Sequence, residues 1–169
     1  MIGDRQHVVL VGLMGSGKTT VGRALAERLQ RPLLDTDELV EQRAGRTIRE
    51  IFTSDGEEVF RKLEAEVLAE VLATDEPVVV ATGGGVVVRA ENRAALDAAD
   101  ARVVWLCAEP STLLDRVRHA GNRPLLDHDP EATLQRMADE RAPLYREVAD
   151  LIVRVDGRST YEVVEAVLR

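Results

Sequence analysis

The 169-residue sequence has the length of one folded domain with a sizeable core, and its formal net charge is −8. This acidic balance argues against a general nucleic-acid binder, which would present a basic surface. No apolar run approaches the ~20 residues of a transmembrane helix, and residues 1–5 do not resemble a signal peptide. We therefore expect a cytoplasmic protein that binds neither nucleic acid nor membranes, with Cys107 as a buried, inert thiol.

Apolar strand patterns alternate with helical patterns along the chain, which is typical of a parallel sheet with helices on both faces. The expected strands cover residues 7–11, 31–34, 77–82, 102–107 and 151–155. The expected helices cover residues 20–29, 57–72, 91–98, 110–117 and 130–140, the last continuing past Pro143, and a final helix opens at Ser159. The pattern predicts an α/β protein with three layers, α/β/α, and a five-stranded parallel sheet within a single domain, residues 1–169.

Residues 38–72 contain no expected strand. Two stretches there, residues 47–50 and 54–57, match the capping-box pattern, so we expect several helices to start in this region, the last of them over residues 57–72. Residues 159–162 match it as well. The helix over residues 57–72 should bury one face, formed by Val59, Phe60, Leu63, Val67, Leu68 and Val71. A helical insertion between strands, residues 36–64, is expected to bind the substrate.

A phosphate-binding loop lies between the first strand and the first helix. Residues 12–19, Gly-Leu-Met-Gly-Ser-Gly-Lys-Thr, match the P-loop pattern without a mismatch. In such a loop the backbone N–H groups and the helix N-terminus face phosphate oxygens, Lys18 reaches the β- and γ-phosphates, and Thr19 ligates Mg²⁺. The predicted ATP-binding residues here are Gly12, Met14, Gly15, Ser16, Gly17, Lys18, Thr19 and Thr20.

Two further groups follow strands and should reach the same edge of the sheet. Asp35 and Asp37 come after the second strand, and the glycine loop, residues 83–85, comes after the third. One carboxylate could orient water around Mg²⁺ while the other faces a substrate hydroxyl, although a solvated acidic turn or a helix N-cap would also explain them. The glycine loop could let a ligand approach the backbone, or it could be a flexible turn.

Arginines supply the remaining candidates. Arg61 and Glu64 are spaced i,i+3, and spacing alone favours an exposed helix salt bridge. Arg116, Arg118 and Arg123 lie in or beside residues 115–130, which we expect to form a mobile lid. Phosphoryl-transfer enzymes stabilise transition-state charge with such arginines, but a solvated loop charge is favoured for Arg118.

Taken together, the motifs resemble the shikimate kinase family of nucleoside-monophosphate-kinase-like P-loop kinases. The similarity covers nearly the whole chain. The P-loop is common to many NTPases, whereas the ordered combination of the other motifs is specific. These motifs are residues 34–37 (LDTD), 60–64 (FRKLE), 82–85 (TGGG), 123–126 (RPLL) and 141–145 (RAPLY).

The resemblance implies transfer of the γ-phosphoryl group of ATP to the 3-hydroxyl of shikimate, a step in chorismate and aromatic amino-acid biosynthesis. It implies that Lys18 and the P-loop amides hold the phosphates, and that Thr19, with Asp35 through water, holds Mg²⁺. Asp37 would contact the shikimate hydroxyls and act as the base. The third strand ends in Ala81-Thr82 rather than a carboxylate, so Asp35 is the better metal-side acid.

By the same resemblance, Arg61 and Arg141 grip the substrate carboxylate, and Glu64 steadies Arg61. The backbone of Gly83, Gly84 and Gly85 contributes further substrate contacts. Arg123, on the lid, meets the transferring phosphate, which makes Asp37, Lys18 and Arg123 the catalytic set. Arg116 and Arg158 would flank adenine, although residues 156–159 match the family only loosely. We expect a monomeric enzyme.

Two other functions remain open at this point. A related P-loop kinase could act on another small hydroxylated metabolite, such as gluconate or a nucleoside monophosphate, because Arg61 and Arg141 would also suit a phosphate. A non-catalytic nucleotide-binding module could have kept the P-loop alone. The retained Asp35, Asp37 and Arg123 argue against that module.

Overall fold

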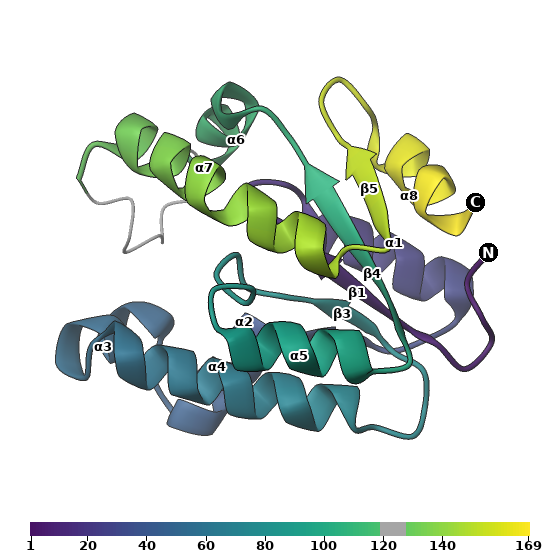
Figure 1. Cartoon of the computed structure of the whole chain (residues 1–169), viewed down its shortest axis with the longest axis horizontal. Helices are drawn as coiled ribbons and strands as arrows, with labels where there is room; N and C mark the ends of the chain where they lie inside the picture. The colour runs from purple at the N-terminus through teal and green to yellow at the C-terminus, as the bar shows by residue number, and fades with distance from the viewer. Residues whose placement is uncertain (119–127) are drawn as a thin grey trace.

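A five-stranded parallel sheet forms the centre of the molecule (Figure 1). The computed structural model describes residues 1–118 and 128–169 of the chain. The strand order is β2-β3-β1-β4-β5, and every neighbouring pair is parallel, as the sequence predicts. The strands are β1 His7–Val11, β2 Leu33–Asp35, β3 Val79–Ala81, β4 Ala101–Cys107 and β5 Leu151–Arg154.

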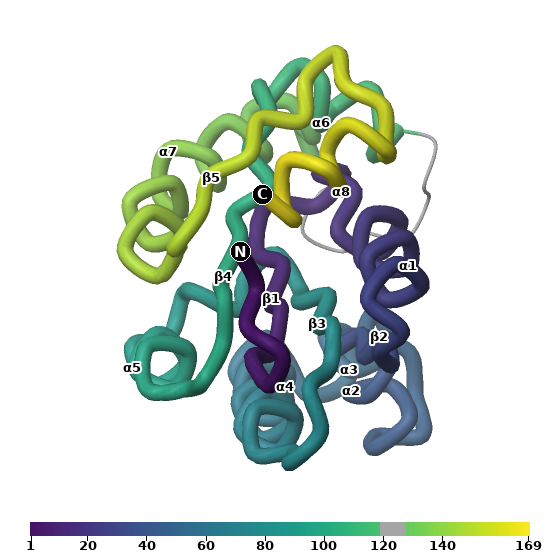
Figure 2. The backbone as a smooth tube through the Cα atoms, turned by 90° about the vertical axis from the view of Figure 1, so that its right-hand side faces the viewer, coloured from purple at the N-terminus to yellow at the C-terminus, as the bar shows by residue number. Residues whose placement is uncertain are grey.

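Helices cover both faces of the sheet, which confirms the three-layer α/β/α architecture (Figure 2). One face packs against α1 Lys18–Leu29 and α8 Thr160–Leu168. The other face packs against α4 Glu57–Leu72, α5 Ala90–Ala98, α6 Pro110–Val117 and α7 Pro130–Val148. The short helices α2 Thr36–Ala44 and α3 Ile48–Ser54 lie beside α4. Among the described residues, no helix is long and apolar enough to cross a membrane.

The central strand β1 shows why its sequence is a continuous apolar run. Val8 and Leu10 point into the core under α1 and α8, whereas Val9 and Val11 point into the core under α4, α5 and α7. All four side chains are fully buried. Because successive side chains of a strand face opposite sides, a strand covered on both faces needs apolar residues at every position. This strand delivers the chain directly to the P-loop.

Two of the three expected capping boxes are present. Thr47 with Glu50 caps α3, and Ser159 with Glu162 caps α8, each through a reciprocal pair of side-chain hydrogen bonds. The capping box expected at Ser54 does not form, because Ser54 is the last residue of α3. The next helix, α4, begins at Glu57 after Gly56, whose φ of 89° lies in the left-handed region that favours glycine. The turn is therefore made by a glycine backbone and not by a serine side chain.

The remaining differences are small. The strand expected at residues 31–34 is Leu33–Asp35, since Pro32 has no N–H for the ladder and only its carbonyl takes part, accepting from the Val79 amide at 2.9 Å. Val59 was expected on the buried face of α4 but is 39% exposed, because that face centres on Phe60, Val67, Leu68 and Val71. Cys107 is a free thiol that is only partly buried, and burial still raises its pKa.

Candidate active site

The P-loop joins β1 to α1 and has the backbone of an anion site. Gly15 and Gly17 have φ values of 83° and 93°, a conformation that glycine adopts without strain. The N-cap residue of α1 is Gly17, which has no side chain to cap the first N–H groups of the helix. The Ser16 hydroxyl is buried and has no hydrogen-bond partner among the described residues. These are the features of a loop that leaves its donors available for phosphate.

Lys18 folds back over this loop. Its Nζ donates hydrogen bonds to the carbonyl oxygens of Gly12, at 2.6 Å, and Leu13, at 3.0 Å. The side chain is buried. A desolvated ammonium group beside free amide donors is a concentrated positive site. The structure therefore brings Gly12, Lys18 and the loop amides together as the P-loop pattern predicts.

Asp35 serves two elements at once. Its Oδ1 accepts hydrogen bonds from the backbone N–H groups of Asp37, at 2.9 Å, and Glu38, at 3.3 Å, and so caps α2. Its Oδ2 accepts a hydrogen bond from the Thr19 hydroxyl at 3.1 Å. The N-cap interpretation is thus correct for one oxygen, while the other oxygen lies beside the P-loop threonine.

This pair fits a magnesium ion held mainly by phosphate and water. Within residues 1–118 and 128–169, no group of three or more His, Cys, Asp or Glu side chains could hold a metal ion. Mg²⁺ does not need such a cage, because it keeps several waters and uses one or two protein oxygens plus substrate phosphates. A hydroxyl and a carboxylate oxygen at one phosphate-binding loop supply that donor set.

The glycine loop packs tightly against the candidate substrate side. A Cβ added at Gly83 would lie 2.6 Å from Asp37 Oδ1 and 2.9 Å from Glu64 Oε2. The Gly83 amide donates a hydrogen bond to the Thr36 hydroxyl at 3.1 Å, which ties the loop to the start of α2. A Cβ at Gly85 would overlap the Arg61 guanidinium. Side chains of Asp37, Glu64 and Arg61 thus approach Gly83 and Gly85 too closely to leave room for a Cβ. The interpretation as a merely flexible turn is therefore wrong.

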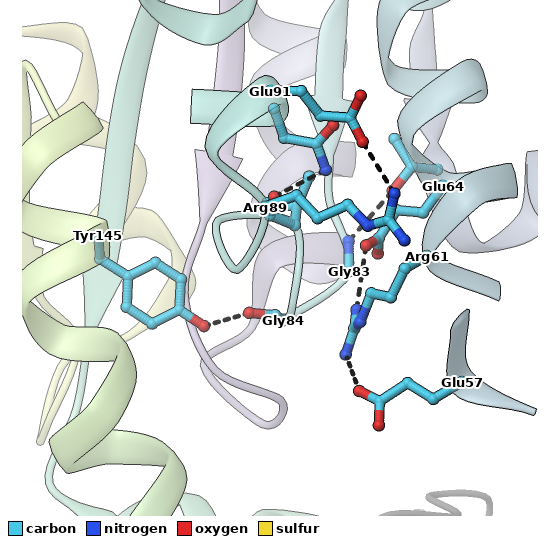
Figure 3. A network of polar contacts seen from close by, with 11 residues as sticks. Glu57, Arg61, Glu64, Gly83, Gly84, Arg89, Glu91 and Tyr145 are labelled. Atoms are coloured by element: carbon cyan, nitrogen blue, oxygen red, sulfur yellow. Dashed lines mark hydrogen bonds and ion pairs between the residues drawn. The ribbon is translucent and has the colours of Figure 1, made fainter. Parts of the chain in front are cut away.

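Arg61 and Glu64 form an ion pair (Figure 3). Their spacing favoured an exposed salt bridge, but the structure buries both side chains. Arg61 Nη1 donates to Glu64 Oε1 at 3.0 Å, and Nη2 donates to Glu57 Oε1 at 3.2 Å. Arg61 is 5% exposed and Glu64 is fully buried. Arg61 Nε and Glu64 Oε2 have no partner among the described residues. The pair therefore leaves one buried donor and one buried acceptor unpaired beside the glycine loop.

Burial of Glu64 raises the pKa of its carboxyl group to about 7, against the opposing effect of the Arg61 charge. Asp37 raises this pKa further, and Arg141 lowers it. Burial thus disfavours the ionised form of Glu64, while the Arg61 charge that it holds favours that form.

Arg141 approaches the same loop from α7. It is 7% exposed, and its Nη1 would lie 3.7 Å from a Cβ at Gly84. Tyr145, one helical turn later, donates a hydrogen bond to the Gly84 carbonyl oxygen (Figure 3). Two buried guanidinium groups from different helices thus lie against adjacent glycines, an arrangement that suits an anionic group such as a carboxylate or a phosphate.

One cleft of about 680 Å³ collects almost all of the predicted residues. Arg116 lies at the P-loop, where its Nη1 donates to the Gly15 carbonyl oxygen at 3.0 Å, and Arg158 lines the cleft from the β5–α8 loop. Gly12 does not line the cleft, and Arg123 lies outside the described residues. The predicted residues in the lining are Met14, Gly15, Ser16, Gly17, Lys18, Thr19, Thr20, Asp35, Asp37, Arg61, Gly83, Gly84, Gly85, Arg116, Arg141 and Arg158.

Sequence reasoning missed several residues of this region. Phe52 and Phe60 line the cleft with their rings 5.0 Å apart, and Glu57 is the second partner of Arg61. The i,i+4 spacing of Glu57 and Arg61 was an available signal. Tyr145 was part of a quoted motif but carried no predicted role.

The comparisons agree with this geometry. The family model described as "Shikimate kinase" matches residues 14–169. A shikimate kinase of Symbiobacterium thermophilum is 53% identical over 96% of this chain and 94% of its own length. The solved shikimate kinase of Acinetobacter baumannii, in complex with shikimate, is 40% identical with a TM-score of 0.92, over 97% of this chain and 91% of that one.

A gluconokinase structure from Sinorhizobium meliloti has the same fold at much lower sequence identity. It covers 98% of this chain and 90% of its own, with 23% identity and a TM-score of 0.61, so it shares the architecture. The family model matches residues 14–169, and the Symbiobacterium thermophilum relative covers nearly the full length at far higher identity. The chain belongs to the shikimate kinase family.

Proposed function

We propose that the chain transfers the γ-phosphoryl group of ATP to the 3-hydroxyl group of shikimate, a step in chorismate and aromatic amino-acid biosynthesis. The observation that carries the proposal is the pair of buried guanidinium groups, Arg61 and Arg141, against the glycine loop. Gly84 also lies against the P-loop, since its Cβ would be 3.3 Å from the Met14 amide nitrogen. An anionic acceptor held by two arginines would therefore meet the phosphate donor across one loop.

On the donor side, the P-loop amides and Lys18 hold the ATP phosphates. The position of the loop at the N-terminus of α1, where Gly17 offers no side-chain cap, and the burial of Lys18 support this role. Arg123 meets the transferring phosphate and lies outside the described residues. Arg116 and Arg158, which are exposed and line the cleft, flank the nucleotide base.

On the acceptor side, Asp37 orients the reacting hydroxyl and accepts its proton. Its Oδ1 lies against Gly83, beside the buried Glu64, and Asp37 lines the same cleft as the two arginines. Phosphoryl transfer passes through a loose transition state, so we assign to Asp37 mainly orientation and late proton acceptance. The unpartnered Nε of Arg61 is a donor for the substrate carboxylate.

Thr19 and, through water, Asp35 would hold Mg²⁺, as their hydrogen-bonded oxygens at the P-loop support. When bound, the ion neutralises charge on the β- and γ-phosphate oxygens. Asp35 Oδ2 would then give up the Thr19 hydroxyl while Oδ1 keeps its cap on α2.

The organisation of the chain is part of the same proposal. Residues 1–169 form one P-loop kinase domain, with residues 36–64 as the substrate-binding insertion and residues 115–130 as the lid, of which 119–127 lie outside the described residues. Helices α2, α3 and the first part of α4 fill the insertion and line the cleft with Glu38, Ile48 and Phe52, which supports its role. A monomeric state and a cytoplasmic location remain predictions.

The test is shikimate-dependent release of ADP from ATP·Mg²⁺ by the purified protein. Gluconate and nucleoside monophosphates, the acceptors of related P-loop kinases, are tested separately as alternative acceptors. We expect ADP release from ATP·Mg²⁺ when shikimate is the acceptor and not with the others. Faster release with another acceptor would replace shikimate in the proposal. A folded protein that binds ATP and phosphorylates none of the acceptors would favour a non-catalytic nucleotide-binding module.

A further inference from the structure

Tyr145 is a buried tyrosine that the catalytic roles above do not use. Its side chain is 1% exposed, and its hydroxyl donates a hydrogen bond to the carbonyl oxygen of Gly84 (Figure 3). Its ring packs on Trp105 of β4, with centroids 5.5 Å apart and planes inclined by 30°. Trp105 is in register with Val11, the last residue of β1 before the P-loop. The ring is therefore held by the central part of the sheet, and the hydroxyl reaches the site.

The partner of this hydroxyl is the residue where the two sides of the cleft meet. A Cβ at Gly84 would lie 3.3 Å from the Met14 amide nitrogen of the P-loop and 3.7 Å from Arg141 Nη1. Arg141 is one helical turn before Tyr145 on α7, so both side chains lie on the same face. A displacement of Gly84 would change its distance to the phosphate donor and to the acceptor grip together.

The hydrogen bond also sets the direction of the next backbone donor. The described chain contains no cis peptide bond, so the Gly84 carbonyl and the Gly85 N–H point in opposite directions. Because the carbonyl is directed at Tyr145, the Gly85 N–H is directed away from α7. Gly85 lines the cleft and lies against the Arg61 guanidinium. Among the described residues, no backbone acceptor pairs with this N–H.

We propose that Tyr145 is a positioning residue for the acceptor: its hydroxyl fixes the Gly84–Gly85 peptide so that the Gly85 N–H and the Arg141 guanidinium face the substrate at a set distance from the P-loop. This inference rests on the proposed function. It assigns to Tyr145 no contact with the substrate and no proton transfer. Burial raises the pKa of its hydroxyl group, so it stays a hydrogen-bond donor throughout the neutral range.

The decisive variant is Tyr145→Phe, which removes the hydroxyl and leaves the ring on Trp105. We expect kcat/KM for shikimate to fall about ten- to hundredfold, as misplacement of a positioning group does. The KM for ATP should stay within about twofold, because the P-loop retains its own contacts. Tyr161→Phe is the matched control, because Tyr161 is 66% exposed on α8 and should change neither value.

A second variant separates the hydroxyl from the packing. Trp105→Phe keeps the Tyr145 hydroxyl and removes part of the ring stack, so it should lower the thermal midpoint while the KM for shikimate stays near the wild-type value. All kinetics are measured well below the midpoint of each variant. The emission maximum of Trp105, the only tryptophan, reports whether the ring stack survives in Tyr145→Phe.

Three outcomes would overturn the inference. One is a Tyr145→Phe enzyme with wild-type kcat/KM for shikimate. Another is a loss that is equal for shikimate and ATP, which indicates a structural role only. The third is a wild-type protein that releases no ADP with shikimate, which refutes the proposed function and this inference with it. An active wild type beside an unchanged Tyr145→Phe refutes the inference alone.

Discussion

The acceptor side and the nucleotide side of the cleft differ in the groups that form them. On the acceptor side, Arg61, Glu64 and Arg141 are buried charged side chains that are held by one another and by the glycine loop. On the nucleotide side, the phosphate site is mostly backbone, and Arg116 and Arg158 are exposed. Buried charges discriminate strongly because an unsuitable ligand leaves them unpaired, whereas exposed charges contribute little. The comparison implies that specificity resides in the acceptor side.

Asp37 lies on the acceptor side against Gly83, and its replacement should have the largest effect. We expect Asp37→Asn to lower kcat by about 10²- to 10⁴-fold, because the reacting hydroxyl loses its orienting acceptor. The KM for ATP should change little. Steady-state ADP release at saturating shikimate and ATP measures kcat, and the same assay at varied ATP concentration measures the KM for ATP. Near-normal turnover would remove Asp37 from the mechanism.

Loss of an acceptor-side arginine should raise the KM for shikimate selectively. We expect Arg61→Ala or Arg141→Ala to raise it roughly 10²-fold, because a charge-assisted pair with the substrate carboxylate is lost, and to raise the KM for ATP much less. Arg43→Ala is the control, because Arg43 pairs with Glu70 on the surface of α2 and α4. Equal effects on both substrates would contradict the carboxylate grip.

Glu64 allows a test of the acceptor side without substrate. Its folded-state pKa of about 7 lies above the ordinary 4.5, so the folded protein binds this proton more tightly than the unfolded chain. This contribution to stability is full below pH 4.5, falls as the pH rises to 7, and is constant above it. Glu64→Gln removes it, so the stability of the variant relative to wild type should rise by up to about 3 kcal/mol over that range.

Urea unfolding at pH 5 and pH 8 measures this difference. The charged groups around the Glu64 carboxyl are Arg61, Arg141 and Asp37, and they remain in the variant. Glu70→Gln, on the exposed face of the same helix, is the control and should show a much smaller pH-dependent change. A Glu64→Gln difference that is independent of pH would show that the carboxyl does not titrate as described.

The smallest effect is expected on the nucleotide side. Because Arg116 and Arg158 are exposed, Arg116→Ala and Arg158→Ala should each raise the KM for ATP by no more than about fivefold. The KM for shikimate should not change. An increase in the KM for ATP as large as the increase in the KM for shikimate in Arg61→Ala would contradict this contrast between the two sides. It would show that exposed charges also bind their ligand strongly.

The sequence predicted best what depends on neighbours in the chain. The P-loop is a local pattern, and its strand and helix contexts are local as well, so its geometry could be foreseen. The burial of Arg61 and Glu64 could not, because i,i+3 spacing is the same on an exposed and on a buried helix face. Their environment comes from the glycine loop, about twenty residues later, which folds over α4.

One wrong prediction and one omission have the same origin. Ser54 fits a capping box in sequence, but the backbone turn at Gly56 places it at the end of α3. Tyr145 belongs to a motif that predicted no role for it, and only the packing of α7 on β4 shows that its hydroxyl meets Gly84. Both depend on contacts between elements, which periodicity does not encode.

The glycine loop has a consequence for inhibitor resistance. Any side chain at Gly83 would strike Asp37 and Glu64, any side chain at Gly85 would strike Arg61, and one at Gly84 would crowd the P-loop amide of Met14. A mutation that blocked a drug at this surface would therefore disturb groups that the enzyme needs for its own substrate. An inhibitor that rests on the backbone of these three glycines would bind a surface with few routes of escape by substitution.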